Sequence, residues 1–302
     1  MPRVLISRCF FEPVRYDGGE VRDSIVDKIK PFIDPIIFCP EVELGLGIPR
    51  PKIILVKEGS EKRLYQPDTG RDLTKDMRVM IREFLSTIGK LDGAILKSKS
   101  PSCGVGSAKL YKGNIVIGKA DGFLVDGLRE LFSGLPIEDE GRLRNKSFYH
   151  HFLTQIFALA RLRGLLENPS PAGLVEFHTS YKFILKACNE RLYRELGRIV
   201  ANGDMPFEEK LKLYSDLFKE TLTRKPTRPR HANILYHLAG YFTKRIKPKE
   251  RDHLLGLIER YRAGEIDLRT PLEVIRSLAI RFEESYVLGQ MYLTPFKEDL
   301  WG

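Results

Sequence analysis

The chain has 302 residues, of which 42% are hydrophobic, 30% charged and 10% aromatic, and its formal net charge is +10. This composition excludes a disordered or low-complexity protein, and the length suffices for two domains with separate cores. No apolar run approaches the roughly 18 residues of a membrane span, and no secretory signal opens the chain. We therefore expect a cytoplasmic protein without a membrane partner.

The first 140 residues alternate short β-rich runs with amphipathic stretches, which is typical of an α/β sheet protein. Helices are predicted over 24–30 and from 74 to about 88, where apolar side chains recur at helical spacing. Strands are predicted over 3–7, 34–38, 53–57, 92–97 and, more weakly, 114–118. The predicted fold class is α/β, with an open, mostly parallel sheet in an amino-terminal domain, 1–140.

From residue 142 onward helical patterns dominate, with glycine and proline between most of them. Helices are predicted over 144–166, 172–201, 206–223, 230–243, 248–263 and 271–284. The carboxyl-terminal domain, 141–302, is therefore predicted to be all-helical, and the acidic stretch 136–141 is the predicted linker. Residues 1–140 hold 22 basic and 21 acidic side chains, whereas 141–302 hold 28 and 19, so the basic surplus lies in the second domain.

Three of the four cysteines come after predicted strands. Cys9 follows the first strand, Cys39 the second, and Cys103 lies in the loop after 92–97. In an open parallel sheet such loops gather along one edge, where ligands bind, so these thiols are expected to converge. Three thiolates suit a catalytic zinc or an iron–sulfur cluster with one open iron, and the alternative for each cysteine is a packing role.

Three strings carry a resemblance to a known family. They are CFFEPVRYDG from Cys9, CPEVELGLGIPR from Cys39 to Arg50, and LKSKSPSCG from Leu96 to Gly104. Together and in this order they resemble the thiouracil desulfidase family, domain of unknown function 523. Residues 142–302 resemble a second family, domain of unknown function 1722, through Phe177-His178, Tyr181-Lys182, His231, Asn233, His237, Gly240-Tyr241-Phe242 and Gln290 to Pro295.

The resemblance implies a [4Fe-4S] cluster held by Cys9, Cys39 and Cys103, with one iron left open for the substrate's sulfur. The fused pair of domains implies removal of sulfur from 4-thiouridine in transfer RNA. A thiocarbonyl is a soft donor, and its coordination to iron would activate the C–S bond for attack by water. Hydrolysis of C=S to C=O needs no electron transfer.

Two residues are predicted to be catalytic. Glu41 lies two residues after a cysteine and is assigned the acid/base role, with capping of a helix after Pro40 as the alternative. Ser100 is a catalytic candidate through the family resemblance, with a turn role ahead of Pro101 as the alternative. For Ser102 the turn role is preferred.

Weaker predictions concern binding. Arg15, Tyr16, Asp17 and Arg50 are candidates to hold the base or a phosphate, and a turn at Asp17 or ion pairs of the arginines are the alternatives. The spacing of the histidines does not favour a metal site. Cys188, inside a predicted helix, is interpreted as a packing residue.

The basic stretch 224–251 is the predicted RNA-binding region, in which two basic clusters flank a helix with aromatic residues. A solvated surface is the alternative. Its candidate residues are Arg224, Lys225, Arg228, Arg230, Lys244, Arg245 and Lys247. Transfer RNA is the predicted partner, no DNA partner is expected, and no oligomeric state is predicted. The alternative functions are a desulfidase of free thiouracil or another small thiolated molecule, and a non-catalytic RNA-binding or redox-sensing iron–sulfur protein.

Overall fold

The computed structural model describes residues 1–301, which form two compact units. Residues 1–160 and 299–301 make up the first unit, and residues 161–298 make up the second. The division falls inside helix α6 (Lys146–Glu167), whereas the predicted domains divide before this helix. The end of the chain returns to the first unit, where Lys28 Nζ donates a hydrogen bond of 3.1 Å to the carbonyl oxygen of Trp301.

The first unit is built on a four-stranded parallel sheet, here called sheet A. Its order is β2 (Asp34–Phe38), β1 (Arg3–Ser7), β6 (Gly93–Leu96) and β9 (Ile137–Asp139). Val4, Leu5 and Ile6 are all fully buried, as expected for a central strand that is covered on both faces. The predicted strands 3–7 and 34–38 are confirmed at their exact bounds.

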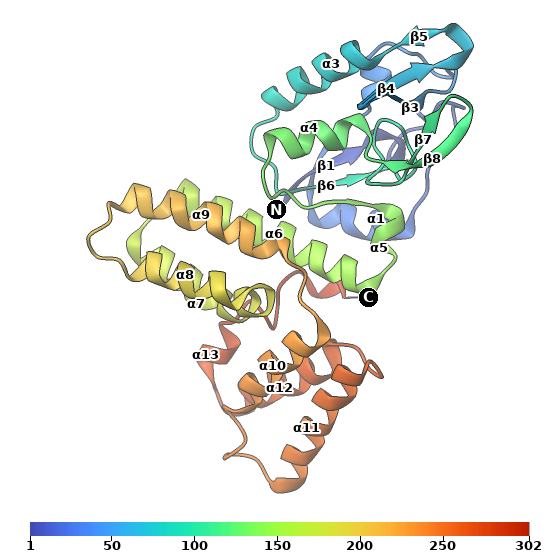
Figure 1. Ribbon diagram of the computed structural model, residues 1–302. Helices are drawn as coiled ribbons and strands as arrows, with labels where there is room; N and C mark the ends of the chain where they lie inside the picture. The colour runs from blue at the N-terminus through green and yellow to red at the C-terminus, as the bar shows by residue number, and fades with distance from the viewer. Residues whose placement is uncertain (302) are drawn as a thin grey trace. The chain divides into compact units, whose positions relative to one another are not determined.

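Helices cover both faces of sheet A (Figure 1). On one face, α3 (Thr74–Thr87) and α4 (Phe123–Leu131) share an apolar core with Leu5 and Ala94. On the other lie α1 (Ser24–Ile29) and α5 (Glu140–Leu143). The resulting layers leave the carboxyl ends of the parallel strands free to carry loops.

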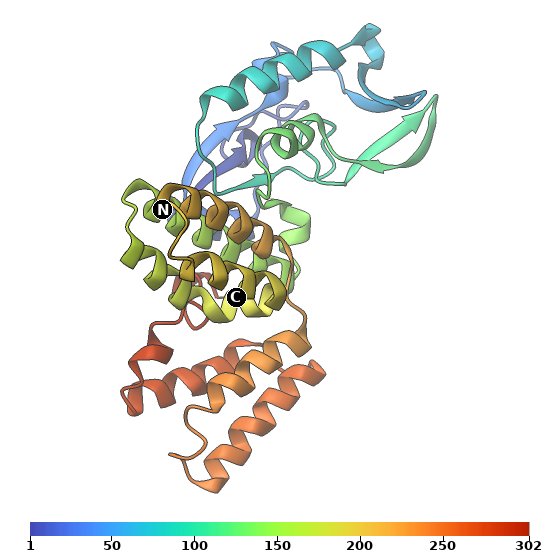
Figure 2. The same ribbon diagram turned by 60° about the vertical axis from the view of Figure 1, so that its left-hand side comes forward.

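A second sheet, sheet B, packs on the same core. Its strand order is β5-β4-β3-β7-β8, with bounds Arg71–Asp72, Glu61–Gln66, Ile54–Glu58, Ala108–Lys112 and Ile115–Ala120. Only β3 and β7 pair in parallel, and the other neighbours are antiparallel. Figure 2 shows the β7–β8 hairpin, in green, extending away from sheet A.

Several elements of the first unit were not predicted, and the linker prediction was wrong. The stretch 136–141 contains β9, which pairs with β6, so the acidic segment is a strand of sheet A rather than a connection between domains. Strands β4, β5 and β7 and helix α4 also escaped the sequence analysis. These strands are short or rich in charged residues, and their partners in the sheet stabilise them rather than their own hydrophobic pattern.

The second unit contains no strand within residues 161–298, so the predicted fold class is confirmed. Its helices after α6 are α7 (Pro171–Cys188), α8 (Glu190–Ala201), α9 (Phe207–Thr223), α10 (Arg228–Ala239), α11 (Pro248–Ala263), α12 (Arg269–Arg281) and α13 (Ser285–Leu288). The single helix predicted over 172–201 is divided by Asn189. That residue is extended, and its side chain accepts a hydrogen bond from the Leu192 amide, which starts α8.

An aromatic cluster holds part of the helical unit together. Tyr181, Tyr214 and Phe218 are fully buried, and their rings lie 5.3 to 5.9 Å apart where they contact. Such rings supply much of the buried apolar area of a small helical core. Among residues 1–301, the helices are all too short or too polar to span a bilayer.

Candidate functional site

The three predicted site cysteines lie at the carboxyl ends of three neighbouring parallel strands. Cys9 sits in a 3-10 turn directly after β1, and Cys39 follows β2 and precedes α2 (Pro40–Glu43). Cys103 lies in the loop after β6. Since the order is β2-β1-β6, adjacent strands carry all three loops, as the sequence predicted. The three side chains are buried and none is in a disulfide.

The Cys103 loop is held by close backbone packing at two glycines. A Cβ atom on Gly104 would lie 2.9 Å from the Ser100 carbonyl oxygen, and one on Gly122 would lie 2.5 Å from the backbone of Ser102. The Gly122 amide donates a hydrogen bond of 2.8 Å to the Gly104 carbonyl oxygen. Only residues without a side chain allow this approach, which fixes the position of Cys103.

One cavity of about 1070 Å³ brings together most of the predicted site residues. Its lining includes Cys9, Cys39, Cys103, Glu41, Ser100, Arg15, Tyr16 and Arg50. The loops after β1, β2 and β6 supply most of this wall, so residues far apart in the sequence meet because parallel strands end at the same edge.

The thiols of this cavity resist ionisation. Burial, and secondly the neighbouring Cys39, raise the pKa of the Cys9 thiol to about 12, although the Lys97 ammonium acts in the opposite direction. Burial and then Cys39 raise the pKa of Cys103 well above its ordinary value, and burial also raises the pKa of Cys39. Three such thiols become thiolates together only when a cationic centre binds them and displaces their protons.

The donor set fits an iron–sulfur cluster by its chemistry. Three thiols open on one cavity, and the fourth cysteine, Cys188, lies in the helical unit. Thiolates are the ligands that iron–sulfur clusters use. Within residues 1–301, no group of three or more His, Cys, Asp or Glu side chains is placed to hold a single metal ion.

Glu41 is buried in the cavity wall with a set of partners. Arg50 Nε donates to Glu41 Oε2 at 2.8 Å, and the side chains of Arg50 and Glu41 are only 3% and 12% exposed. The Arg50 guanidinium also donates to the carbonyl oxygens of Gly47 and Val14. The ion pair weighed for Arg50 in the sequence analysis is therefore present, and it fixes the position of the Glu41 carboxylate in the cavity wall.

Both serines of the Cys103 loop contact the Glu41 carboxylate. Ser102 Oγ, fully buried, donates to Glu41 Oε1 at 2.9 Å, whereas Ser100 Oγ lies 3.5 Å from the same oxygen. Ser100 Oγ accepts hydrogen bonds of 3.2 Å from the amides of Ser102 and Cys103. Ser100 thus also stabilises the turn, which was its alternative role, and Ser102, for which the turn role was preferred, makes the shorter of the two contacts with Glu41.

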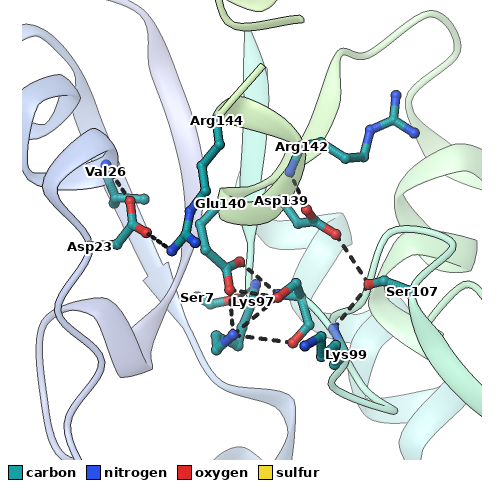
Figure 3. Close-up of polar contacts among 11 residues, drawn as sticks. Ser7, Asp23, Val26, Lys97, Lys99, Ser107, Asp139, Glu140, Arg142 and Arg144 are labelled. Atoms are coloured by element: carbon teal, nitrogen blue, oxygen red, sulfur yellow. Dashed lines mark hydrogen bonds and ion pairs between the residues drawn. The ribbon is translucent and has the colours of Figure 1, made fainter. Parts of the chain in front are cut away.

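Sequence reasoning also missed a polar network around Lys97 and the buried Glu140 (Figure 3). The Lys97 ammonium contacts the buried Glu140 carboxylate, which also accepts hydrogen bonds from the Ser98 amide at 2.7 Å and hydroxyl at 2.6 Å. Lys97 lines the cavity and influences the Cys9 thiol. Lys97 lies in the LKSKSPSCG string, which the sequence analysis singled out. Glu140 lies in the stretch 136–141, which was predicted to be a linker, and was therefore not considered as a site residue.

The same network shapes the loop that carries Ser100. Asp139 accepts hydrogen bonds from the Arg142 amide at 2.9 Å and from Ser107 Oγ at 3.1 Å, and Ser107 Oγ in turn accepts from the Lys99 amide at 2.9 Å. Lys99 has a left-handed backbone, with φ of 63°. A lysine in this conformation is strained, and these hydrogen bonds stabilise it.

Of the weaker binding candidates in the first unit, some line the cavity and one has a structural role instead. Arg15 and Tyr16 line the cavity, but Arg15 also forms an ion pair of 3.1 Å with Asp17. The Asp17 carboxylate accepts a hydrogen bond from the Gly19 amide, which is the turn role considered for it.

The predicted RNA-binding residues of the helical unit include several with internal partners. Arg228 donates to the Tyr261 carbonyl oxygen at 3.1 Å, and Arg230 donates to that of Cys188. Arg245 pairs with Glu284 at 3.1 Å, and the Lys247 amide caps α11 through Glu250. Arg224 and Lys244 are exposed and Lys225 is half-buried. Cys188 is 1% exposed, which confirms its packing role.

Comparison with known proteins agrees with both resemblances. Residues 4–140 match the family model of 2-thiouracil desulfurase, and residues 182–297 match that of a protein of unknown function, DUF1722. YbgA of Escherichia coli strain K12, described as an uncharacterized protein, is 34% identical over 154 residues, which cover 49% of this chain and 87% of YbgA. The chain belongs to the YbgA family. This YbgA-family chain also matches the 2-thiouracil desulfurase model over residues 4–140, so the predicted pair of resemblances is confirmed.

A solved structure adds a further similarity. It is that of TudS, a [4Fe-4S]-dependent thiouracil desulfidase, with 27% sequence identity and a TM-score of 0.39. The match covers 48% of this chain and 94% of TudS.

Proposed function

We propose that the protein is an iron–sulfur-dependent desulfidase that converts 4-thiouridine in cytoplasmic transfer RNA to uridine. Water adds across the C=S bond, so that a C–O bond replaces the C–S bond and sulfur leaves as hydrogen sulfide. The atoms balance without an oxidant or a reductant. The observation that carries the proposal is the convergence of three buried thiols, from three adjacent parallel strands, on one cavity in a 2-thiouracil desulfurase domain.

Cys9, Cys39 and Cys103 would hold a [4Fe-4S] cluster. When bound by three thiolates, such a cluster supplies an iron that can accept the soft sulfur of a thiocarbonyl and polarise the C–S bond. All three cysteines are buried in the wall of the cavity.

Glu41 is the proton acceptor in this proposal. Its Oε2 is bound by the positively charged Arg50, its Oε1 accepts from the neutral Ser102, and the residue lines the cavity that the cysteines share. Oε1 is therefore the oxygen that takes a proton from the attacking water and returns it to the departing sulfur. Ser102, and at longer range Ser100, act as positioning residues for this carboxylate.

Two features support a macromolecular substrate over free thiouracil. The cavity of about 1070 Å³ is larger than a single base requires, and the chain carries a separate basic helical unit. Free thiouracil is the second candidate substrate, because the matching family model is named for 2-thiouracil.

The test is anaerobic reconstitution followed by iron and sulfide analysis and by turnover of thiolated transfer RNA, 4-thiouridine and 2-thiouracil. The proposal predicts about four irons per chain and a kcat/KM for transfer RNA above those for the small molecules. A reconstituted protein that holds iron but acts only on 2-thiouracil would replace the RNA substrate with the free base. A protein that binds no iron would overturn the mechanism.

A further inference from the structure

The cavity of the first unit carries a large excess of basic side chains. Nine of its lining residues are lysine or arginine, and two, Glu41 and Asp139, are acidic. Arg50 already neutralises Glu41. The first 140 residues are almost neutral as a whole. The excess of basic side chains at the cavity is therefore matched by acidic side chains in other parts of this segment.

Four of these lysines lack an acidic partner. Within residues 1–301, no carboxylate lies at ion-pair distance from Lys52, Lys99, Lys109 or Lys119. All four are exposed at the cavity, and Lys52 lies with its Nζ 5.2 Å from the centre of the Tyr16 ring. The other arginines of the wall, in contrast, have carboxylate partners, as Arg8 has Glu12 and Arg142 has Glu138.

The β7–β8 hairpin places two of the four lysines directly opposite each other. Lys109 and Lys119 are cross-strand partners in the antiparallel register, and both line the cavity. Like charges in this position repel and destabilise a sheet. The hairpin has no carboxylate of its own that could offset this repulsion, whereas an anionic ligand lying against this face would do so.

The hairpin also adds an aromatic side chain to the same wall. Tyr111 lines the cavity, and the strand register shifts between Leu110 and Tyr111. A shift of this kind turns a side chain away from its regular direction. Tyrosine rings among unpaired cations are typical of surfaces that hold nucleotides, where bases stack and phosphates bind ammonium groups.

We infer that Lys52, Lys99, Lys109 and Lys119 form a phosphate-binding rim around the cysteine cavity. Resting on the proposed function, this inference assigns contacts with the phosphates of the substrate to these four lysines, and therefore to the catalytic unit itself. The phosphate belongs either to the thiolated nucleotide or to its neighbours in an RNA strand, and both sources offer the same oxygens to the ammonium groups.

The test compares two double variants that lose the same charge from sheet B. Lys109→Gln/Lys119→Gln removes the opposed pair, and Lys57→Gln/Lys112→Gln removes two exposed lysines of the same sheet outside the cavity lining. Each protein is assayed for iron content, for the thermal midpoint, and for kcat/KM with 4-thiouridine, 4-thiouridine 5′-monophosphate and thiolated transfer RNA. Binding of transfer RNA is also measured without turnover, as a function of salt.

We expect the first variant to keep its iron and its thermal midpoint, since it relieves a repulsion. Its ratio of kcat/KM for transfer RNA to that for 4-thiouridine should fall about 10-fold or more, and the slope of log affinity against log salt should drop by about 1 for each lysine. A parallel loss with the monophosphate would identify the nucleotide's own phosphate, and a loss confined to RNA would identify neighbouring phosphates.

Equal ratios and salt slopes in the two variants would overturn the inference. The binding arm separates this failure from a failure of the proposed function. If the unmodified protein turned over no thiolated substrate, the proposed function would fail, while the salt slope of RNA binding would still decide whether the opposed lysines contact phosphate.

Discussion

The cavity rim of the first unit and the basic stretch 224–251 of the helical unit contain the same residue types in different circumstances. In the helical stretch, Arg228, Arg230 and Arg245 donate to backbone carbonyl oxygens or pair with a carboxylate. At the cavity rim, Lys109 and Lys119 face each other without an acidic partner in the part of the chain that the structure describes. The helical unit has the larger net charge, but several of its basic side chains bind groups of the protein itself.

This difference shows that the net charge of a segment does not locate the charge that a ligand can use. A guanidinium that caps a helix end or pairs with a carboxylate contributes to stability, and its field is partly cancelled. An unpaired ammonium group beside a concave wall attracts anions, because the low-dielectric wall focuses its field.

Cysteine replacement is the strongest way to test whether the two units differ in chemistry. We expect Cys9→Ala to lose its iron and to reduce turnover by at least about 10³-fold, because the substrate's sulfur then has no metal to bind. Iron analysis and a desulfuration assay check this. Cys188→Ala is the matched control in the helical unit and should keep both iron and activity. Full iron in Cys9→Ala would contradict the assignment.

Removal of the proton acceptor should have the next largest effect. Glu41→Gln keeps the size of the side chain and can still bond to Ser102, but it cannot accept a proton. We expect kcat to fall about 10²- to 10⁴-fold, with the iron content retained. Single-turnover kinetics on a thiolated substrate, with iron content as the control, measure this loss. An unchanged kcat would show that another group moves the proton.

Stability measurements can test whether the arginines of the stretch 224–251 stabilise the folded protein. Arg228→Gln removes the hydrogen bond to the Tyr261 carbonyl oxygen and should lower the free energy of unfolding by about 1 kcal/mol, since the side chain is exposed. Lys244→Gln, at an exposed lysine of the same stretch, should leave it unchanged. Urea unfolding compares the two. Equal stability in both variants would remove the distinction between the helical stretch and the cavity rim.

The smallest predicted effect is a pH dependence of stability in the helical unit. Burial lowers the pKa of His178 below its ordinary value of 6.5. As the pH falls through 6.5, the unfolded chain takes up the proton before the folded one does, so stability decreases below this pH. Urea unfolding between pH 7.5 and 5.5 should show a weaker decrease for His178→Gln than for the unmodified protein, and identical slopes would contradict the prediction.

Much of the site could be predicted because its residues follow strands with strong patterns. Strands β1 and β2 were predicted at their exact bounds, since their apolar runs end at polar, glycine-rich loops. The cysteines after them were thereby placed at one edge of a parallel sheet. The RNA-binding residues and the catalytic roles remain predictions, which the variants above can test.

The sequence by itself determined the two families, the change from α/β to helical structure, and the three cysteines at the strand ends, because each depends on local pattern and spacing. Only the tertiary structure decided that 137–139 is a strand, that Ser102 rather than Ser100 bonds closely to Glu41, and that Lys109 opposes Lys119. These facts depend on which side chains meet across strands and loops. Such contacts are set by the pairing of segments that are far apart in the sequence, and the hydrophobic pattern of each segment does not reveal its partner.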